Sequence, residues 1–126
     1  MRRTMLLACS VVVALAAVTG CGTPRDVSTP SKALLGHWRN TIPGTNNDVY
    51  FSGDVVTYAQ EGGTRPIPVK YRVAGEDAEK FALEIRIGPA EPTKVSFSAD
   101  RKDMTMLPAR IPELLRYEYV DAGQKP

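Results

Sequence analysis

Apolar and polar residues alternate with a period of two in several stretches of this chain, and this pattern constrains the fold more than any other feature. The clearest stretch is 80–87, whose apolar members are Phe81, Leu83, Ile85 and Ile87. A period of two puts the apolar side chains on one face of an extended strand and the polar ones on the other. The same alternation at 69–73, 95–99 and 115–119 predicts three further strands with one buried face.

Four weaker strand candidates have a shorter or less regular apolar pattern: 36–42, 47–52, 54–60 and 103–107. All the candidates begin about 11 residues apart, which leaves no room for a crossover helix between parallel strands. We therefore expect an all-β fold, an antiparallel up-and-down meander of about eight strands. Such strands most economically form a barrel or a strongly bent sheet, because closure removes exposed edges. An open two-layer sandwich is the alternative.

In an up-and-down order, alternate connections lie at opposite ends of the sheet. The first, third, fifth and seventh connections all contain proline, within 43–44, 62–66, 88–92 and 108–112, and the first three of these also contain glycine. The second, fourth and sixth are charged and free of proline, and they predict simple turns at 52–54, 75–77 and 100–102. The chain enters the first strand at the simple-turn end. We predict that the opposite, proline-rich rim is the working face.

The first 20 residues have the features of an export signal. Arg2 and Arg3 precede an apolar stretch from Met5 to Val18, which is the pattern of a secretory signal peptide. The stretch is shorter than the ~20 residues that a transmembrane helix needs. Small residues then precede a cysteine, in Val18-Thr19-Gly20-Cys21.

This four-residue box resembles the bacterial lipoprotein signal. The resemblance implies cleavage between Gly20 and Cys21, a diacylglycerol on the Cys21 sulfur, and a further acyl chain such as palmitate on its amino group. Two or more acyl chains hold a protein stably on a membrane. The resemblance therefore implies a lipid-anchored protein on the exported side of the cell membrane or the outer membrane. The alternative for Cys21 is a disulfide, but its one partner, Cys9, lies in the segment that would be removed.

The sequence accordingly divides into four parts. These are a signal peptide (1–20), a lipidated cysteine with a flexible linker (21–31), a β-barrel domain (32–122) and a C-terminal tail (123–126). Glycine, proline, serine and threonine dominate the linker, which is typical of a flexible spacer. Thr29 followed by Pro30 predicts one short helical turn over 30–35, which Gly36 would end.

Composition argues against several classes of function. Two of the 16 basic residues lie in the signal segment, which leaves 14 against 14 acidic residues, so we expect no nucleic-acid partner. The single histidine, His37, leaves no histidine-based metal cluster and no paired nucleophile and base. We therefore expect no metal, no cofactor and no enzymatic activity. His37 alternates with Trp38, so we expect it to face solvent.

The first predicted strand of the domain begins with Leu35-Gly36-His37-Trp38. A Gly-x-Trp at the first strand of an eight-stranded meander resembles the lipocalin (calycin) family. The resemblance implies a barrel in which Trp38 packs across one end. It also implies that an arginine of the last strand covers this tryptophan, and Arg116 is the candidate for that role.

Two functions remain open for such a domain. In the first, the barrel holds one small apolar ligand, for which an eight-stranded barrel has just enough room. Trp38, Tyr58 and Tyr71 are then candidate contacts, because aromatic side chains combine apolar surface with a polar tip. Arg65 and Arg110 on the proline-rich rim are candidates for receiving a carboxylate or a phosphate, or for docking on an envelope protein.

In the second, the inward-facing side chains fill the barrel without a ligand. The side chains that we expect to point inward include Trp38, Val73, Met104, Met106 and Tyr117. With a solid core, the domain would be an interaction module of the cell envelope or an inhibitor of a cell-wall hydrolase.

Overall fold

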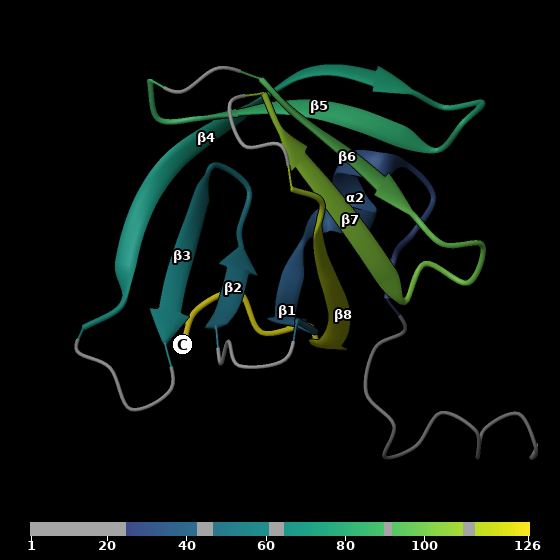
Figure 1. Cartoon of the computed structure of the whole chain (residues 1–126). Helices are drawn as coiled ribbons and strands as arrows, with labels where there is room; N and C mark the ends of the chain where they lie inside the picture. Colours follow the sequence, from purple (N-terminus) through teal and green to yellow (C-terminus); the bar gives the residue numbers. More distant parts are fainter. Residues whose placement is uncertain (1–24, 43–46, 61–64, 90–91, 110–112) are drawn as a thin grey trace, which may run out of the picture.

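The computed structural model describes residues 25–42, 47–60, 65–89, 92–109 and 113–126. Eight strands follow one another in chain order around a closed barrel (Figure 1). Their bounds are β1 Gly36–Asn40, β2 Asn47–Phe51, β3 Val55–Gln60, β4 Ile67–Asp77, β5 Ala82–Ile87, β6 Thr93–Phe97, β7 Asp103–Pro108 and β8 Leu115–Asp121. Every neighbouring pair is antiparallel. The all-β, up-and-down fold is thus confirmed, and each strand begins within two residues of its expected start.

Pairing between the first and last strands closes the barrel. His37 of β1 lies opposite Asp121 of β8, and Asn40 lies opposite Tyr117. The register shifts between His37 and Trp38, which is the sign of a local bulge. Because closure pairs both edges of the sheet, the open sandwich considered above is wrong.

The hairpin of β4 and β5 differs from the sequence-based expectation. The turn lies at 78–81, whereas 75–77 was predicted, and residues 75–77 still pair with β5. The register of this pair shifts between Val73 and Gly75, and such a shift changes the direction of the neighbouring side chains. Val73, which was expected to point inward, is 38% exposed.

A short helix covers one end of the barrel. Helix α2 (Pro30–Leu34) begins after Thr29, whose side chain accepts a hydrogen bond from the backbone nitrogen of Lys32 at 3.3 Å. The predicted helical turn is therefore confirmed. The helix lies behind β6 and β7 in the view of Figure 1, and it buries Pro30, Ala33 and Leu34. Its Leu34 carbonyl accepts a hydrogen bond of 2.8 Å from Trp38 Nε1, so the helix and the first strand are joined at this end.

Aromatic rings complete the same end, which we call the closed end: helix α2 with Trp38, Phe97 and Tyr119. Trp38 is fully buried and meets the ring of Tyr119 edge-on, with 5.3 Å between the centroids. The ring centroid of Phe97 lies 6.1 Å from that of Trp38. The arginine over Trp38 is Arg25, from the segment expected to be a linker; its Cζ lies 5.1 Å from the Trp38 ring centroid. The expectation for Arg116 is wrong, since Arg116 is exposed on β8.

The apolar core extends from the closed end into the middle of the barrel. Its largest fully buried side chains are Trp38, Phe51, Leu34, Ile85, Met104, Val49, Val56, Val95 and Pro30. These residues come from the helix and from six of the eight strands, so the barrel has one continuous core. The strands β2, β4, β6 and β8 begin at the opposite end, which we call the open end. Most of the connections that were predicted to form a proline-rich rim there lie outside the described residues.

Gly36 is the residue at which the chain passes from the helix into β1, and its conformation requires glycine. Its φ is +124°, and an added Cβ would lie 2.8 Å from the backbone oxygen of Asp121 and 2.9 Å from the ring of Tyr119. Backbone strain and steric overlap therefore act together. We expect Gly36→Ala to lower the free energy of unfolding by about 2–3 kcal/mol, measured by denaturant unfolding.

Gly53→Ala is the matched control for this substitution. Gly53 lies in the turn between β2 and β3, and an added Cβ would meet no atom within 4 Å. The free energy of unfolding of the Gly53→Ala protein should differ from that of the unmodified protein by less than about 0.5 kcal/mol. An equal loss of unfolding free energy in the two variants would contradict the steric explanation for Gly36.

Candidate functional site

A cavity of about 330 Å³ lies inside the open end of the barrel. Residues at this end of β2, β3, β5, β6, β7 and β8 line it, together with Phe51 below them: Val49, Phe51, Tyr58, Ile87, Thr93, Met106, Pro108, Leu115 and Tyr117. Most of these side chains are apolar, and the polar atoms come from one threonine and two tyrosine hydroxyls. The lining is of the kind that binds a small, largely apolar molecule.

A second hollow, of about 450 Å³, adjoins the cavity and forms its mouth. The two share Val49, Tyr58, Leu115 and Tyr117. The mouth adds polar and charged groups, of which Arg65 lies just before β4 and Glu113 just before β8. The site thus changes from apolar inside to mixed polar and charged at its entrance.

Burial in the cavity wall affects the ionisation of two tyrosines. Burial, with a smaller contribution from nearby Tyr117, raises the pKa of Tyr58 to about 12. Burial also raises the pKa of Tyr117, against a hydrogen bond with Asn40 that acts to lower it. Both hydroxyls therefore stay neutral over the physiological range, and they can donate or accept hydrogen bonds to a ligand.

The structure brings two of the predicted site residues together and separates the others. Tyr58 lines both the cavity and its mouth, and Arg65 lines the mouth. Trp38 is buried at the closed end, where it contacts Tyr119 rather than the cavity. Tyr71 is buried as well, and its hydroxyl donates to the backbone oxygen of Ser52 at 2.5 Å. Cys21 and Arg110, the remaining predicted residues, lie outside the described residues.

Several residues of the site were missed by the sequence analysis, and some carried a usable signal. Val49 is 2% exposed and lines both hollows. It lies two residues before Phe51, so the alternation along β2 already placed it on the inward face. Asn40 is the last residue of β1 and Glu113 lies two residues before β8, and both line the mouth. No periodic pattern of apolar residues indicates such positions.

His37 is the clearest correction among the polar residues. It was expected to face solvent, yet it is 7% exposed. Its side chain lies outside the barrel, where it stacks on Tyr50 with 4.2 Å between the ring centroids. Its Nε2 lies 2.7 Å from Asp48 Oδ2, and its Nδ1 lies 3.5 Å from Asp121 Oδ2. The neighbouring strands thus cover the histidine.

The carboxylate beside His37 is held in its charged form. Partial burial acts to raise the pKa of Asp48, but hydrogen bonds from Arg39 and His37 outweigh it, and the pKa is lowered. The Nε of Arg39 lies 3.2 Å from Asp48 Oδ1. These contacts tie β1 to β2 on the outer face of the barrel, remote from the cavity lining.

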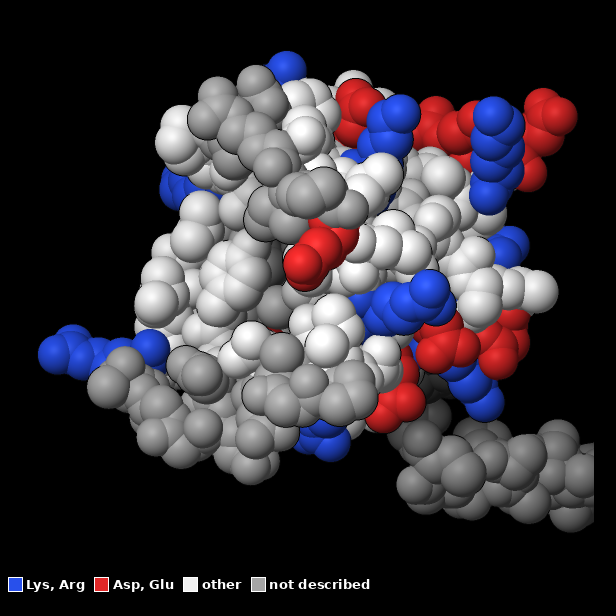
Figure 2. Space-filling view, viewed as in Figure 1, with Lys and Arg blue, Asp and Glu red and all other residues white. Residues whose placement is uncertain are grey.

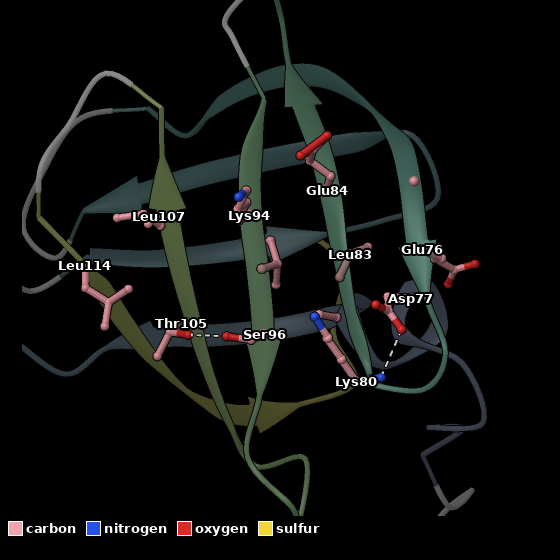
Figure 3. A pocket seen from close by; sticks show the side chains of 13 residues that line it. Glu76, Asp77, Lys80, Leu83, Glu84, Lys94, Ser96, Thr105, Leu107 and Leu114 are labelled. Carbon is pink, nitrogen blue, oxygen red and sulfur yellow. Dashed lines mark hydrogen bonds between the residues drawn. The ribbon is translucent and has the colours of Figure 1, made fainter.

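A third hollow, of about 590 Å³, lies on the outer surface of β4 to β7 (Figure 3). Figure 3 shows Glu84, Lys94, Ser96 and Thr105 across neighbouring strands. Glu84 is paired with Lys94, and Ser96 with Thr105, whose hydroxyl lies 2.7 Å from that of Ser96. The hydroxyls of Ser96 and Thr105 already pair with each other, so this hollow is a less suitable binding site than the cavity.

Charged side chains also gather away from the cavity. Figure 2 shows acidic and basic side chains together where Figure 1 places the tip of the β4–β5 hairpin. Glu76, Asp77, Glu79 and Lys80 lie in or beside this turn, and all four are exposed. Charges of both signs at an exposed turn are typical of a solvated surface.

Comparisons with protein-family models, with curated protein sequences and with solved structures find no match for this chain. Within the described ranges, no group of three or more histidine, cysteine, aspartate or glutamate side chains is arranged to hold a metal ion. None of the helices described by the structure has the length and apolar character needed to cross a membrane.

The pKa values of the tyrosines predict how the protein responds to alkali. Burial raises the pKa of both Tyr58 and Tyr71 to about 12, from an ordinary value of 10.0. Because the folded state favours their neutral form, the stability that these two groups contribute is fully present below pH 10 and is lost as the pH rises towards 12. Tyr58 is 37% exposed and Tyr71 is 7% exposed, so the larger part of this contribution comes from Tyr71. A phenolate absorbance titration should show these two tyrosines ionising last.

Phenylalanine variants assign the steps of this titration. Tyr58→Phe and Tyr71→Phe should each remove one tyrosine from the last step, whereas the control Tyr50→Phe should remove one from an earlier step. Burial raises the pKa of Tyr50 as well, but less strongly. Loss of an early step in Tyr58→Phe would contradict the placement of Tyr58 in the cavity wall.

Proposed function

We propose that this protein is a lipid-anchored, non-enzymatic lipoprotein of the bacterial envelope, which binds a small apolar ligand through the open end of its lipocalin-like barrel. The observation that carries the proposal is the cavity of about 330 Å³ between the fully packed middle of the barrel and the rim. Ligand sites are usually concave, mostly apolar and about 300–1,000 Å³ in volume. The cavity is at the lower limit of that range, so the ligand is small.

The lining supports a ligand that is apolar with one or two polar atoms. Val49, Leu115 and Met106 provide apolar walls, and the hydroxyls of Tyr58 and Tyr117 provide the polar contacts. A few polar groups in an apolar pocket fix the orientation of a ligand, because each group left unpaired on binding costs free energy. Arg65 and Glu113 at the mouth add charges of both signs.

The same chemistry supports a binding role rather than catalysis. An activated nucleophile needs a lowered pKa or an adjacent base. The pKa values of Tyr58 and Tyr117 are raised instead, which makes these hydroxyls poor nucleophiles at neutral pH. Their chemistry is that of neutral hydrogen-bonding groups.

A specific observation also favours a second candidate, which is docking of a protein partner on the rim. Ile67 lines the mouth and is 61% exposed, and Leu114, just before β8, is 41% exposed and lines the outer hollow. Exposed apolar side chains at one end of a domain are a feature of interaction surfaces. The cavity, however, supports the ligand over the solid core that the interaction module or hydrolase inhibitor was expected to have.

The sequence supports the lipid anchor. The box Val18-Thr19-Gly20-Cys21 follows an apolar segment that is preceded by two arginines. From Gly22 to Pro126 the chain contains no cysteine, so Cys21 is the single thiol left after cleavage before it. Attachment of acyl chains there would hold the barrel on the exported side of a membrane.

Filling the cavity with a larger side chain should weaken ligand binding. Leu115 lines both the cavity and the mouth, so Leu115→Trp places a larger ring in the shared space. We expect at least a tenfold loss of affinity for N-phenyl-1-naphthylamine, an uncharged apolar fluorophore, because the ring occupies its volume. The measurement is the increase in probe fluorescence on titration with protein.

Leu107→Trp is the matched control, since Leu107 is 41% exposed and lines the outer hollow. It should bind the probe as the unmodified protein does. Trp38 lies at the closed end, so its own fluorescence is a poor reporter of this site. Equal binding by the two variants would contradict the ligand proposal and leave docking on the rim as the better explanation.

The anchor is tested by the intact mass of protein extracted from membranes. We expect a mass that corresponds to a chain beginning at Cys21 with added acyl groups, and Cys21→Ser should abolish both the added mass and the cleavage. A Cys21→Ser protein that is still processed after residue 20 and still sediments with membranes would contradict the lipoprotein assignment. Cys9→Ser is the control and should change neither property.

A further inference from the structure

The segment before the barrel is fixed to the closed end by Arg25. The Cζ of its guanidinium lies 3.8 Å from the Tyr119 ring centroid and 5.1 Å from that of Trp38. Its Nη1 donates to the Arg101 carbonyl at 2.6 Å, and its Nη2 donates to the Ala33 carbonyl at 2.7 Å. Cation–π contacts and hydrogen bonds from a charged donor are among the stronger polar interactions in proteins. Arg25 is therefore part of the barrel and not of a free linker.

Two further contacts hold the residues between Arg25 and β1. The backbone nitrogen of Ser31 donates to Glu76 Oε1 at 2.7 Å, which joins the helix to β4. Lys32 and Asp26 form an exposed ion pair at 3.5 Å, which adds little. Attachment at both Arg25 and Ser31 means that the chain is bound to the barrel along this segment rather than at one point.

This attachment shortens the tether. The sequence alone predicted a linker up to residue 31, which extends to at most about 35 Å. With Arg25 bound, three residues separate Cys21 from the barrel, namely Gly22, Thr23 and Pro24. Four residue steps of extended chain span at most about 14 Å. An acyl group on Cys21 would keep the closed end next to the bilayer.

We propose that the closed end of the barrel is a membrane-facing surface, and that the cavity opens away from the bilayer in which the protein is anchored. This inference depends on the proposed lipid anchor at Cys21. Most strands have five to seven residues and are about 17–23 Å long, and their tilt in a barrel leaves the two ends at least about 12 Å apart. A ligand must then reach the cavity from the aqueous side, because the mouth cannot touch the anchoring membrane.

The charges at the closed end indicate that the tether, and not electrostatic attraction, sets this orientation. The exposed residues near Arg25 and in the adjoining turns carry both signs, with an excess of acidic residues: Asp26, Lys32, Asp54, Glu76, Asp77, Glu79, Lys80, Asp100 and Lys102. Mixed charges give no net attraction to an anionic lipid surface. The orientation should therefore be insensitive to ionic strength, whereas docking through a basic patch would weaken in salt.

Energy transfer to lipid-bound acceptors tests the orientation in the full lipidated protein. A donor fluorophore is placed on Lys102→Cys at the closed end or on Ala109→Cys near the open end, both of which are exposed. Vesicles of zwitterionic lipid carry a headgroup acceptor. We expect transfer from position 102 to exceed that from 109 by about twofold or more, given strand lengths of about 20 Å. Equal transfer, or greater transfer from 109, would overturn the orientation.

Two variants test whether Arg25 causes the difference. Arg25→Ala releases the segment and lengthens the tether, so the two labels should give more similar energy transfer. The control Arg72→Ala, on the exposed face of β4, should leave the difference between the two labels unchanged. Should Arg25→Ala fail to fold, insertion of ten Gly/Ser residues between Gly22 and Thr23 lengthens the tether with Arg25 left in place. A difference that survives this insertion would overturn the role of the short tether.

The mass of the same sample separates this inference from the anchor proposal. Absence of acyl groups would contradict both proposals. Acylated protein with equal transfer from the two labels would contradict the orientation alone. Transfer that collapses as salt is raised would show electrostatic docking and would overturn the tether explanation.

Discussion

Pairing of β1 with β8 is the constraint on which the rest of the structure depends. It converts a meander into a closed barrel in which Trp38 of the first strand lies opposite Tyr119 of the last. The same two residues form the aromatic contact that blocks the closed end. Without this pairing, both edge strands would expose unpaired backbone groups, and the enclosed space at the other end would lose its wall.

The two ends of the barrel differ because of what fills them. At the closed end, Leu34 from helix α2 and three aromatic rings occupy the interior, and Arg25 covers them. At the open end, the cavity is lined by Val49, Thr93 and Leu115 together with the larger Tyr58 and Tyr117. A barrel of this size can be filled by side chains alone, and among the described residues nothing comparable to helix α2 and Arg25 covers this end.

The strand pattern was predictable from the sequence, because period-two alternation and short spacings follow from the backbone geometry of a sheet. The closed barrel is consistent with the resemblance carried by Gly36 and Trp38, and Gly36 has a steric reason to be glycine. The identity of the arginine over Trp38 was not predictable. Arg25 reaches the ring from a segment whose composition is that of a linker, and only tertiary contacts distinguish it from Arg116.

The candidate site was predictable only in part. Arg65 was placed at the working end because the connections alternate between the ends, whereas Tyr58 was chosen for its aromatic chemistry; both line the mouth. Trp38 and Tyr71 were chosen for their chemistry, and composition does not indicate that their polar atoms are already used by Leu34 and Ser52. Burial of His37 depends on Tyr50 and on the carboxylates of two neighbouring strands, which the alternation along β1 alone does not reveal.

The seam between the first and last strands also has a consequence for the order of folding. His37 and Asp121 meet across a separation of 84 residues, and contacts between distant parts of a chain slow the search for the native state. While the chain is being made or delivered from its N-terminus, the first seven strands can assemble only into an open curved sheet. The last strand completes the enclosure, so the interior becomes sealed from water only once β8 has joined the sheet.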